Sequence, residues 1–181
     1  MHGAEINLLG WVISAFVSTL LIASAWHKWQ DLPLFRSHLE AYGLLPAAAA
    51  EGATYALPVA ELLAAVLMLL PVAGVCGHAL AMGLLLLYAA AMGINVLRGR
   101  TDLECGCGGP ALRVGWGLVA RNLVLCALLA GAAWHTGRIA DTASWVTAMG
   151  AGVLLWVLYA LIEKVMGYLA KAKQLHATNP T

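Results

Sequence analysis

Two cysteines separated by one residue are the part of this chain best suited to chemistry. Cys105 and Cys107 flank Gly106, and two more glycines follow, in a segment between two long apolar runs. In an extended segment, residues two apart point to the same side, so both thiols face one partner. A disulfide between them needs a bend, which Gly106 permits. So small a ring is strained, and strained disulfides are the labile, catalytic type. The motif predicts thiol redox chemistry.

Three other roles for this Cys-Gly-Cys pair stay open. A structural zinc site takes four ligands, but the remaining cysteines, Cys76 and Cys126, fall inside apolar runs, so we expect no metal centre of that kind. Two thiolates suffice for a soft ion such as Cu(I), which makes a soft-metal carrier an alternative. The third possibility is that Cys105 and Cys107 are two unpaired loop cysteines without a function.

The composition indicates how such a loop is held. Hydrophobic residues make up 62% of the chain and charged residues 10%, and the mean hydropathy is +0.82. Such a chain is an integral membrane protein. A spanning helix needs about 20 apolar residues, and the first apolar run lacks the basic leader of a cleaved signal peptide, so we expect it to stay as an anchor. We predict one all-α domain over residues 1–181, with five spans near 6–25, 55–70, 75–97, 114–134 and 144–165.

A short amphipathic helix is expected after the first span, over residues 32–42. Leu32, Phe35, Leu39 and Tyr42 recur at helical spacing, Asp31 is a candidate N-cap, and Gly43 fits a helix stop. We predict that it lies in the membrane interface. A loop helix packed on the bundle is the alternative. The Cys-Gly-Cys loop is placed at residues 98–113.

Four polar residues should lie near the face that carries this loop. Helix directions bring Lys28, Glu61, Asn95 and Arg121 there, and ionisable groups inside a membrane are costly unless they are paired or functional. The cations, Arg121 above all, would favour a reactive thiolate, and Glu61 would balance charge or relay a proton. A purely structural ion pair between Glu61 and Arg121 is the competing interpretation.

The distribution of basic residues predicts an orientation. The loops on the cysteine side and the tail carry most of them: Lys28, Arg36, Arg98, Arg100, Arg113, Lys164, Lys171 and Lys173. The other loop face carries Arg138. By the positive-inside rule, the cysteine loop faces the cytoplasm and the N-terminus lies outside.

Two stretches of the sequence resemble a known family. The segment from Asn95 through Cys107 to Gly109, Asn-Val-Leu-Arg-Gly-Arg-Thr-Asp-Leu-Glu-Cys-Gly-Cys-Gly-Gly, is similar to the signature of MauE, the methylamine utilisation membrane protein, within the DoxX-like small membrane proteins. The pattern His27-Lys28, Asp31, Phe35, Leu39, Tyr42-Gly-Leu-Leu-Pro46 and Pro58-Val-Ala-Glu61 resembles the same group. The two stretches fall within roughly the first 125 residues. Gly108 departs from the pattern, which has an aromatic residue there.

The resemblance implies a role in maturing a periplasmic enzyme. MauE-like proteins are associated with methylamine dehydrogenase, whose small subunit is rich in disulfides, and with MauD, a thioredoxin-like partner. Cys105 and Cys107 would then be the redox pair that exchanges with MauD, in the bacterial inner membrane. That role needs access to the periplasm, in conflict with the charge rule.

Other functions and ligands remain open at this stage. A DoxX-like subunit of a quinone-linked oxidoreductase would bind a quinone among the spans, with Glu61 or Arg121 as polar contacts, and would not need the cysteines. A quinone is therefore the one cofactor left open. We expect a lipid bilayer around the chain and no nucleic-acid partner.

Overall fold

The described part of the chain folds into six helices. The computed structural model describes residues 2–70, 74–103, 114–135 and 142–178, and the side chains of 8–70, 74–103, 114–133 and 142–168. The helices are α1 (His2–Gln30), α2 (Leu32–Tyr42), α3 (Ala47–Leu69), α4 (Gly74–Leu97), α5 (Trp116–His135) and α6 (Thr142–Thr178), without a strand in the described ranges. Five of them, all but α2, are long and apolar enough to cross a membrane. The predicted all-α membrane protein is confirmed.

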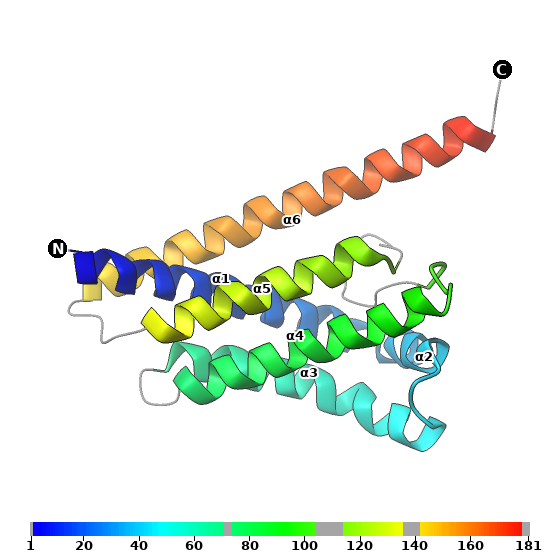
Figure 1. Cartoon of the computed structure of the whole chain (residues 1–181), viewed down its shortest axis with the longest axis horizontal. Coiled ribbons are helices and arrows are strands. Elements are labelled where there is room, and N and C mark those ends of the chain that lie inside the picture. The colour runs from blue at the N-terminus through cyan, green and yellow to red at the C-terminus, as the bar shows by residue number, and fades with distance from the viewer. Residues whose placement is uncertain (1, 71–73, 104–113, 136–141, 179–181) are drawn as a thin grey trace.

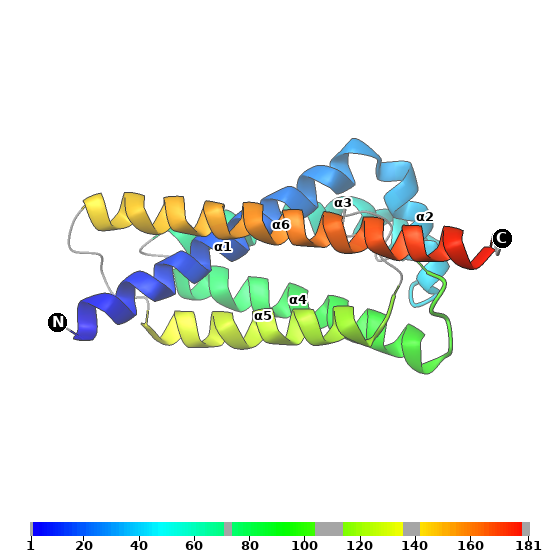
Figure 2. The same cartoon turned by 90° about the horizontal axis from the view of Figure 1, so that it is seen from above.

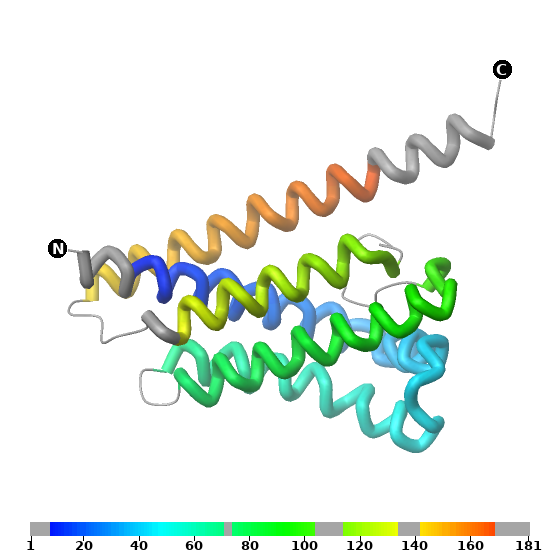
Figure 3. Tube along the Cα trace, viewed as in Figure 1, coloured from blue at the N-terminus to red at the C-terminus, as the bar shows by residue number. Residues whose placement is uncertain are grey.

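Helix α1 is the centre of the bundle. It contacts α2, α3, α5 and α6, whereas α3 with α4 and α4 with α5 form antiparallel pairs beside it (Figures 1 and 3). Half of the residues in the most apolar part of α1 are buried, 50% against 11% in α6. Helix α6 therefore lies at the periphery, where it contacts α1, and in Figure 2 the two helices cross at an angle.

Two glycines allow close helix packing. A Cβ on Gly77 of α4 would lie 2.2 Å from the backbone nitrogen of Met68 in α3. A Cβ on Gly152 of α6 would lie 2.5 Å from Cβ of Ala15 in α1. Small residues let membrane helices approach at their backbones, where dispersion replaces the missing hydrophobic force. These two contacts hold the α3–α4 hairpin and the α1–α6 pair.

Helix α2 forms over the residues predicted for it. The Asp31 side chain accepts a hydrogen bond from the Leu34 N–H at 3.0 Å, as an N-cap does. Gly43 ends the helix in the left-handed region, with φ +62°. Phe35 is its buried residue. The location of α2 at the membrane interface stays a prediction.

A glycine turn after α4 places Arg100 against the C-terminal end of α2. Gly99 adopts φ +73°, and the N–H groups of Gly99 and Arg100 donate to the carbonyls of Val96 and Asn95 at 3.0 and 2.9 Å. This Schellman motif ends α4 and directs the chain back. The Arg100 guanidinium then donates to the Ala41 carbonyl at 2.7 Å. A cation at a helix C-terminus stabilises the helix dipole.

The helix boundaries differ from the predicted spans at three places. Helix α1 continues to Gln30, so Lys28 lies within it and is 3% exposed. Lys28 is therefore a buried residue and not one of the loop cations that set the orientation. Helix α3 begins at Ala47, because four alanines follow Pro46 and favour helix, and Pro58 lies inside it. Helix α6 reaches Thr178.

Candidate functional site

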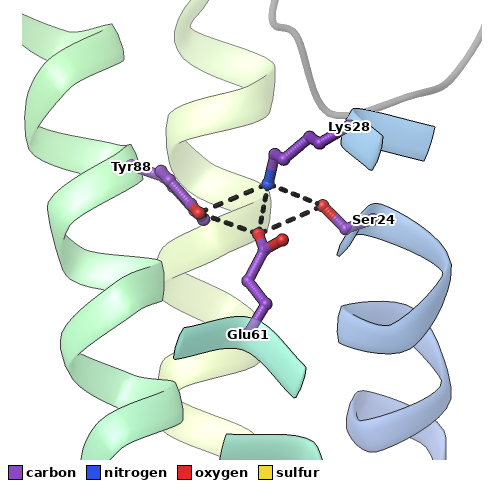
Figure 4. A network of polar contacts seen from close by, with 4 residues as sticks. All are labelled: Ser24, Lys28, Glu61 and Tyr88. Carbon is purple, nitrogen blue, oxygen red and sulfur yellow. Dashed lines mark hydrogen bonds and ion pairs between the residues drawn. The ribbon is translucent and has the colours of Figure 1, made fainter. Parts of the chain in front are cut away.

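A buried polar network joins three helices near one end of the bundle. Lys28 and Ser24 come from α1, Glu61 from α3 and Tyr88 from α4, and their polar groups converge (Figure 4). Lys28 Nζ forms an ion pair with Glu61 Oε1 and donates to Ser24 Oγ at 3.0 Å and to the Tyr88 hydroxyl at 3.3 Å. Glu61 Oε1 also accepts from the hydroxyls of Ser24 and Tyr88, at 3.2 and 2.8 Å.

The network is buried, and its two opposite charges balance. The Lys28 and Glu61 side chains are 2% and 0% exposed, so each charge depends on the other for compensation. Lys28 Nζ also lies 4.8 Å from the ring centroid of Tyr88 and 5.3 Å from that of Phe35, within the range of cation–π attraction. Glu61 Oε2 is buried and has no hydrogen-bond partner among the described atoms. An unused buried acceptor is costly.

A second ion pair joins α5 to α6. Arg121 Nη1 and Glu163 Oε1 lie 2.7 Å apart, with side chains 20% and 24% exposed. The Tyr159 hydroxyl donates to the same carboxylate oxygen, and the Arg121 guanidinium lies 5.8 Å from the Tyr159 ring centroid. The ion pair between Glu61 and Arg121 that was considered from the sequence is therefore wrong. Glu61 pairs with Lys28 of α1 and Arg121 pairs with Glu163 of α6.

The ends of the cysteine loop are tied together. The Val114 N–H donates to the Leu103 carbonyl at 2.8 Å, and Val114 is 2% exposed in a cluster with Ala89, Met92 and Val119. We call the Leu103–Val114 pair the loop neck. Cys105, Gly106 and Cys107 lie outside the described residues, so the redox pair stays a prediction. The neck nevertheless fixes where the loop leaves and re-enters the bundle.

Asn95 lies close in sequence to this neck. Its side chain is 0% exposed, its amide nitrogen donates to the Ala91 carbonyl at 3.0 Å, and its Oδ1 has no hydrogen-bond partner among the described atoms. Lys28 in the last turn of α1, Asn95 near the end of α4 and Arg121 near the start of α5 all lie at the end of the bundle that carries α2, on the right of Figure 1. These three residues thus lie on helix ends that share one side of the bundle, and their predicted role beside the cysteines stays a prediction.

A cavity of about 150 Å³ lies against the network. Its wall is almost wholly apolar and combines residues of α1, α2, α3 and α4 with the chain after α2: Lys28, Phe35, His38, Leu39, Tyr42, Leu44, Leu45, Leu57, Leu87, Tyr88, Ala91 and Met92. Apolar cavities of this size stay dry and take up a benzene-sized ring. The cavity is therefore suited to hold a small organic group.

The opposite end of the bundle carries a buried histidine. His78 is 1% exposed, and its Nε2 lies 2.9 Å from Ser14 Oγ while its Nδ1 lies 2.6 Å from the Gly74 carbonyl. Both ring nitrogens have partners, as expected for a structural histidine. Cys76, at the start of α4, also lies at this end and is exposed.

One pKa outside the spans is shifted. The hydrogen bond that Arg36 donates to Glu40, and then the charge of Glu51, raise the pKa of the Arg36 guanidinium above its ordinary value. Arg36 Nε lies 2.9 Å from Glu40 Oε1. All three groups are exposed, so this pair orders the surface of α2 and α3 only weakly.

Ser24 and Tyr88 were missed in the sequence. Ser24 stands four residues before Lys28, on the same helical face. Tyr88 stands seven residues before Asn95, again on one face. Those spacings were visible signals, but a lone serine or tyrosine in an apolar span is too common to single out without the fold.

Comparison with known proteins places the chain in a family. A sequence model described as "Methylamine utilisation protein MauE" matches residues 6–135. The methylamine utilization protein MauE of Paracoccus denitrificans is 35% identical over 173 residues, which cover 93% of this chain and 92% of that protein. The MauE of Paracoccus versutus is 36% identical, with 84% of each covered. That of Methylorubrum extorquens is 36% identical, with 81% of this chain and 82% of that protein covered. No solved structure matches this chain. The chain therefore belongs to the MauE family of methylamine utilisation proteins, as a multi-pass, all-helical membrane protein.

Proposed function

We propose that this protein is a thiol–disulfide redox component of the bacterial inner membrane. In this proposal Cys105 and Cys107 exchange disulfides with a thioredoxin-like, MauD-type partner, and the pair thereby serves disulfide formation in the small subunit of methylamine dehydrogenase. A thiolate attacks the partner's disulfide or is attacked by it, through a mixed disulfide. Membership of the MauE family supplies the context of methylamine utilisation.

The observation that carries the proposal is the loop neck. The hydrogen bond between Leu103 and Val114 holds both ends of the Cys-Gly-Cys segment at the end of the bundle that carries the polar network. Because the two ends of the segment are held together, a partner of the thiols would approach this end of the bundle, and a defined approach favours exchange. Lys28 and Arg121 each pair with a carboxylate, so we assign them the role of holding the helices around the loop.

Trapping of the mixed disulfide tests this function. With Cys105→Ser or Cys107→Ser, the remaining thiol cannot resolve the intermediate, so we expect one of the two variants to accumulate a covalent complex with the MauD-type partner on non-reducing gels. The double variant should trap nothing. Cys76→Ser and Cys126→Ser are matched controls and should behave like the parent chain. Normal disulfide content in the client of the double variant would overturn the proposal, and copper lost from the purified protein in the same variant would favour a soft-metal carrier.

Thiol labelling in intact cells tests which side of the membrane the loop faces. Cys76 and the loop lie at opposite ends of the bundle. In variants that retain only Cys76 or only the loop pair, a membrane-impermeant reagent should therefore label one and not the other. Disulfide formation in a periplasmic client requires the loop pair to react from outside. Labelling of Cys76 alone would support the charge-based orientation and contradict the periplasmic role.

A further inference from the structure

The cavity and the cysteine loop share a wall. Tyr42, Tyr88 and Met92 line the cavity and also pack in the cluster that buries Val114 of the loop neck. A group held in the cavity would therefore lie one side-chain layer from the base of the loop. This juxtaposition comes from described residues and does not depend on where the cysteines themselves lie.

The wall restricts what can enter. A charged ligand would lose its hydration against an almost wholly apolar surface, at high cost, and the Lys28–Glu61 pair leaves no net charge to compensate it. Leu87 and Leu45 in the wall are 52% and 43% exposed, and Leu87 lies in the middle of the α4 span, so the cavity opens toward the hydrocarbon. A ligand of this cavity would therefore be neutral and would enter from the bilayer.

The inner residues favour a ring with a hydrogen-bond acceptor. Phe35, Tyr42 and Tyr88 present aromatic rings and Met92 a thioether, which pack well against a planar ring. The longest hydrogen bond of the network, from Lys28 Nζ to the Tyr88 hydroxyl at 3.3 Å, is the one that a ligand carbonyl can replace at the least cost. A simple hydrocarbon chain would use none of these groups.

We infer that this cavity binds the ring of a lipid-soluble quinone, which reoxidises the Cys105–Cys107 pair. The inference rests on the proposed function, because a pair that gives its disulfide to a partner is left as a dithiol. Its reoxidation breaks two S–H bonds and forms one S–S bond. The two electrons and two protons pass to the two quinone oxygens, which yields a quinol. The oxidant must therefore accept two electrons and two protons within the bilayer.

Quinone binding to the full chain in lipid nanodiscs tests the site. The probe is decylubiquinone, a benzoquinone with a ten-carbon tail, and the quinone retained after gel filtration is extracted and measured by absorbance. Ala91→Leu fills the cavity and should weaken binding at least about tenfold by overpacking. Ala90→Leu is the matched control, since Ala90 is the next residue along α4, is exposed and does not line the cavity. Should Ala91→Leu fail to fold, Tyr88→Phe keeps the ring but removes the hydroxyl, and should weaken binding roughly threefold or more.

Several results would overturn the inference. They are absence of binding to the parent chain, equal binding to Ala91→Leu and Ala90→Leu, and displacement of the quinone by 1-decanol at the same concentration, which would identify a site for lipid chains. Reduced protein should form one quinol for each disulfide, and quinone that binds without being reduced would also refute its role as oxidant.

Trapping of the mixed disulfide needs no quinone. Successful trapping without quinone binding would reject the cavity site alone, and quinone binding without trapping would reject the thiol exchange with the partner.

Discussion

Removal of one partner of the Lys28–Glu61 pair should cost far more stability than removal of both. In Lys28→Met, the Glu61 carboxylate stays buried at 0% exposure without its counter-ion. Breaking a buried pair in this way costs about 3–5 kcal/mol, and Glu61→Met, which strands the Lys28 ammonium, should cost a similar amount. In the double variant both charges are gone. The hydroxyls of Ser24 and Tyr88 then lose their partners, for a residual cost of about 1–2 kcal/mol.

The assay is a double-mutant cycle on the unfolding free energy. Each protein is unfolded reversibly in mixed micelles by rising sodium dodecyl sulfate, and helix content is followed by circular dichroism. Arg36→Met and Glu40→Met provide the matched cycle, because the Arg36–Glu40 pair is exposed at 42% and 46% and should show barely measurable coupling. A Lys28→Met, Glu61→Met protein whose loss equals the sum of the two single losses would refute the reasoning, since the charges would then not depend on one another.

Two further perturbations test the packing that positions the site. Gly152→Leu should destabilise the bundle by about 1–3 kcal/mol, because the added carbons meet the backbone of α1, and Gly150→Leu, with open space around its Cβ position, should stay close to the parent chain in the same unfolding assay. Arg100→Ala removes the hydrogen bond to the last turn of α2 and should raise the rate of proteolytic cleavage near Gly43, whereas cleavage of Arg98→Ala should match that of the parent chain.

Structural features that depend only on residues close together in the sequence could be predicted from the sequence. The apolar runs identified a helical membrane protein because backbone groups in hydrocarbon must be bonded within a helix. Helix α2 was predicted over its observed residues because Asp31 and Gly43 act within one turn of where they stand. The boundaries were less secure where no strong signal interrupts the chain, as at Lys28, which stands in a helix that continues to Gln30.

The tertiary structure decides which charged side chains pair with each other. The sequence by itself determined that Lys28, Glu61, Asn95 and Arg121 tend toward one end, since helix length and direction follow from the apolar pattern. It did not determine that Glu61 pairs with Lys28, because those residues meet only when α1 and α3 cross in one register. The cavity was likewise beyond prediction, as its wall combines four helices. Crossing and rotation of packed helices arise from side-chain fit across the whole bundle, which local patterns do not encode.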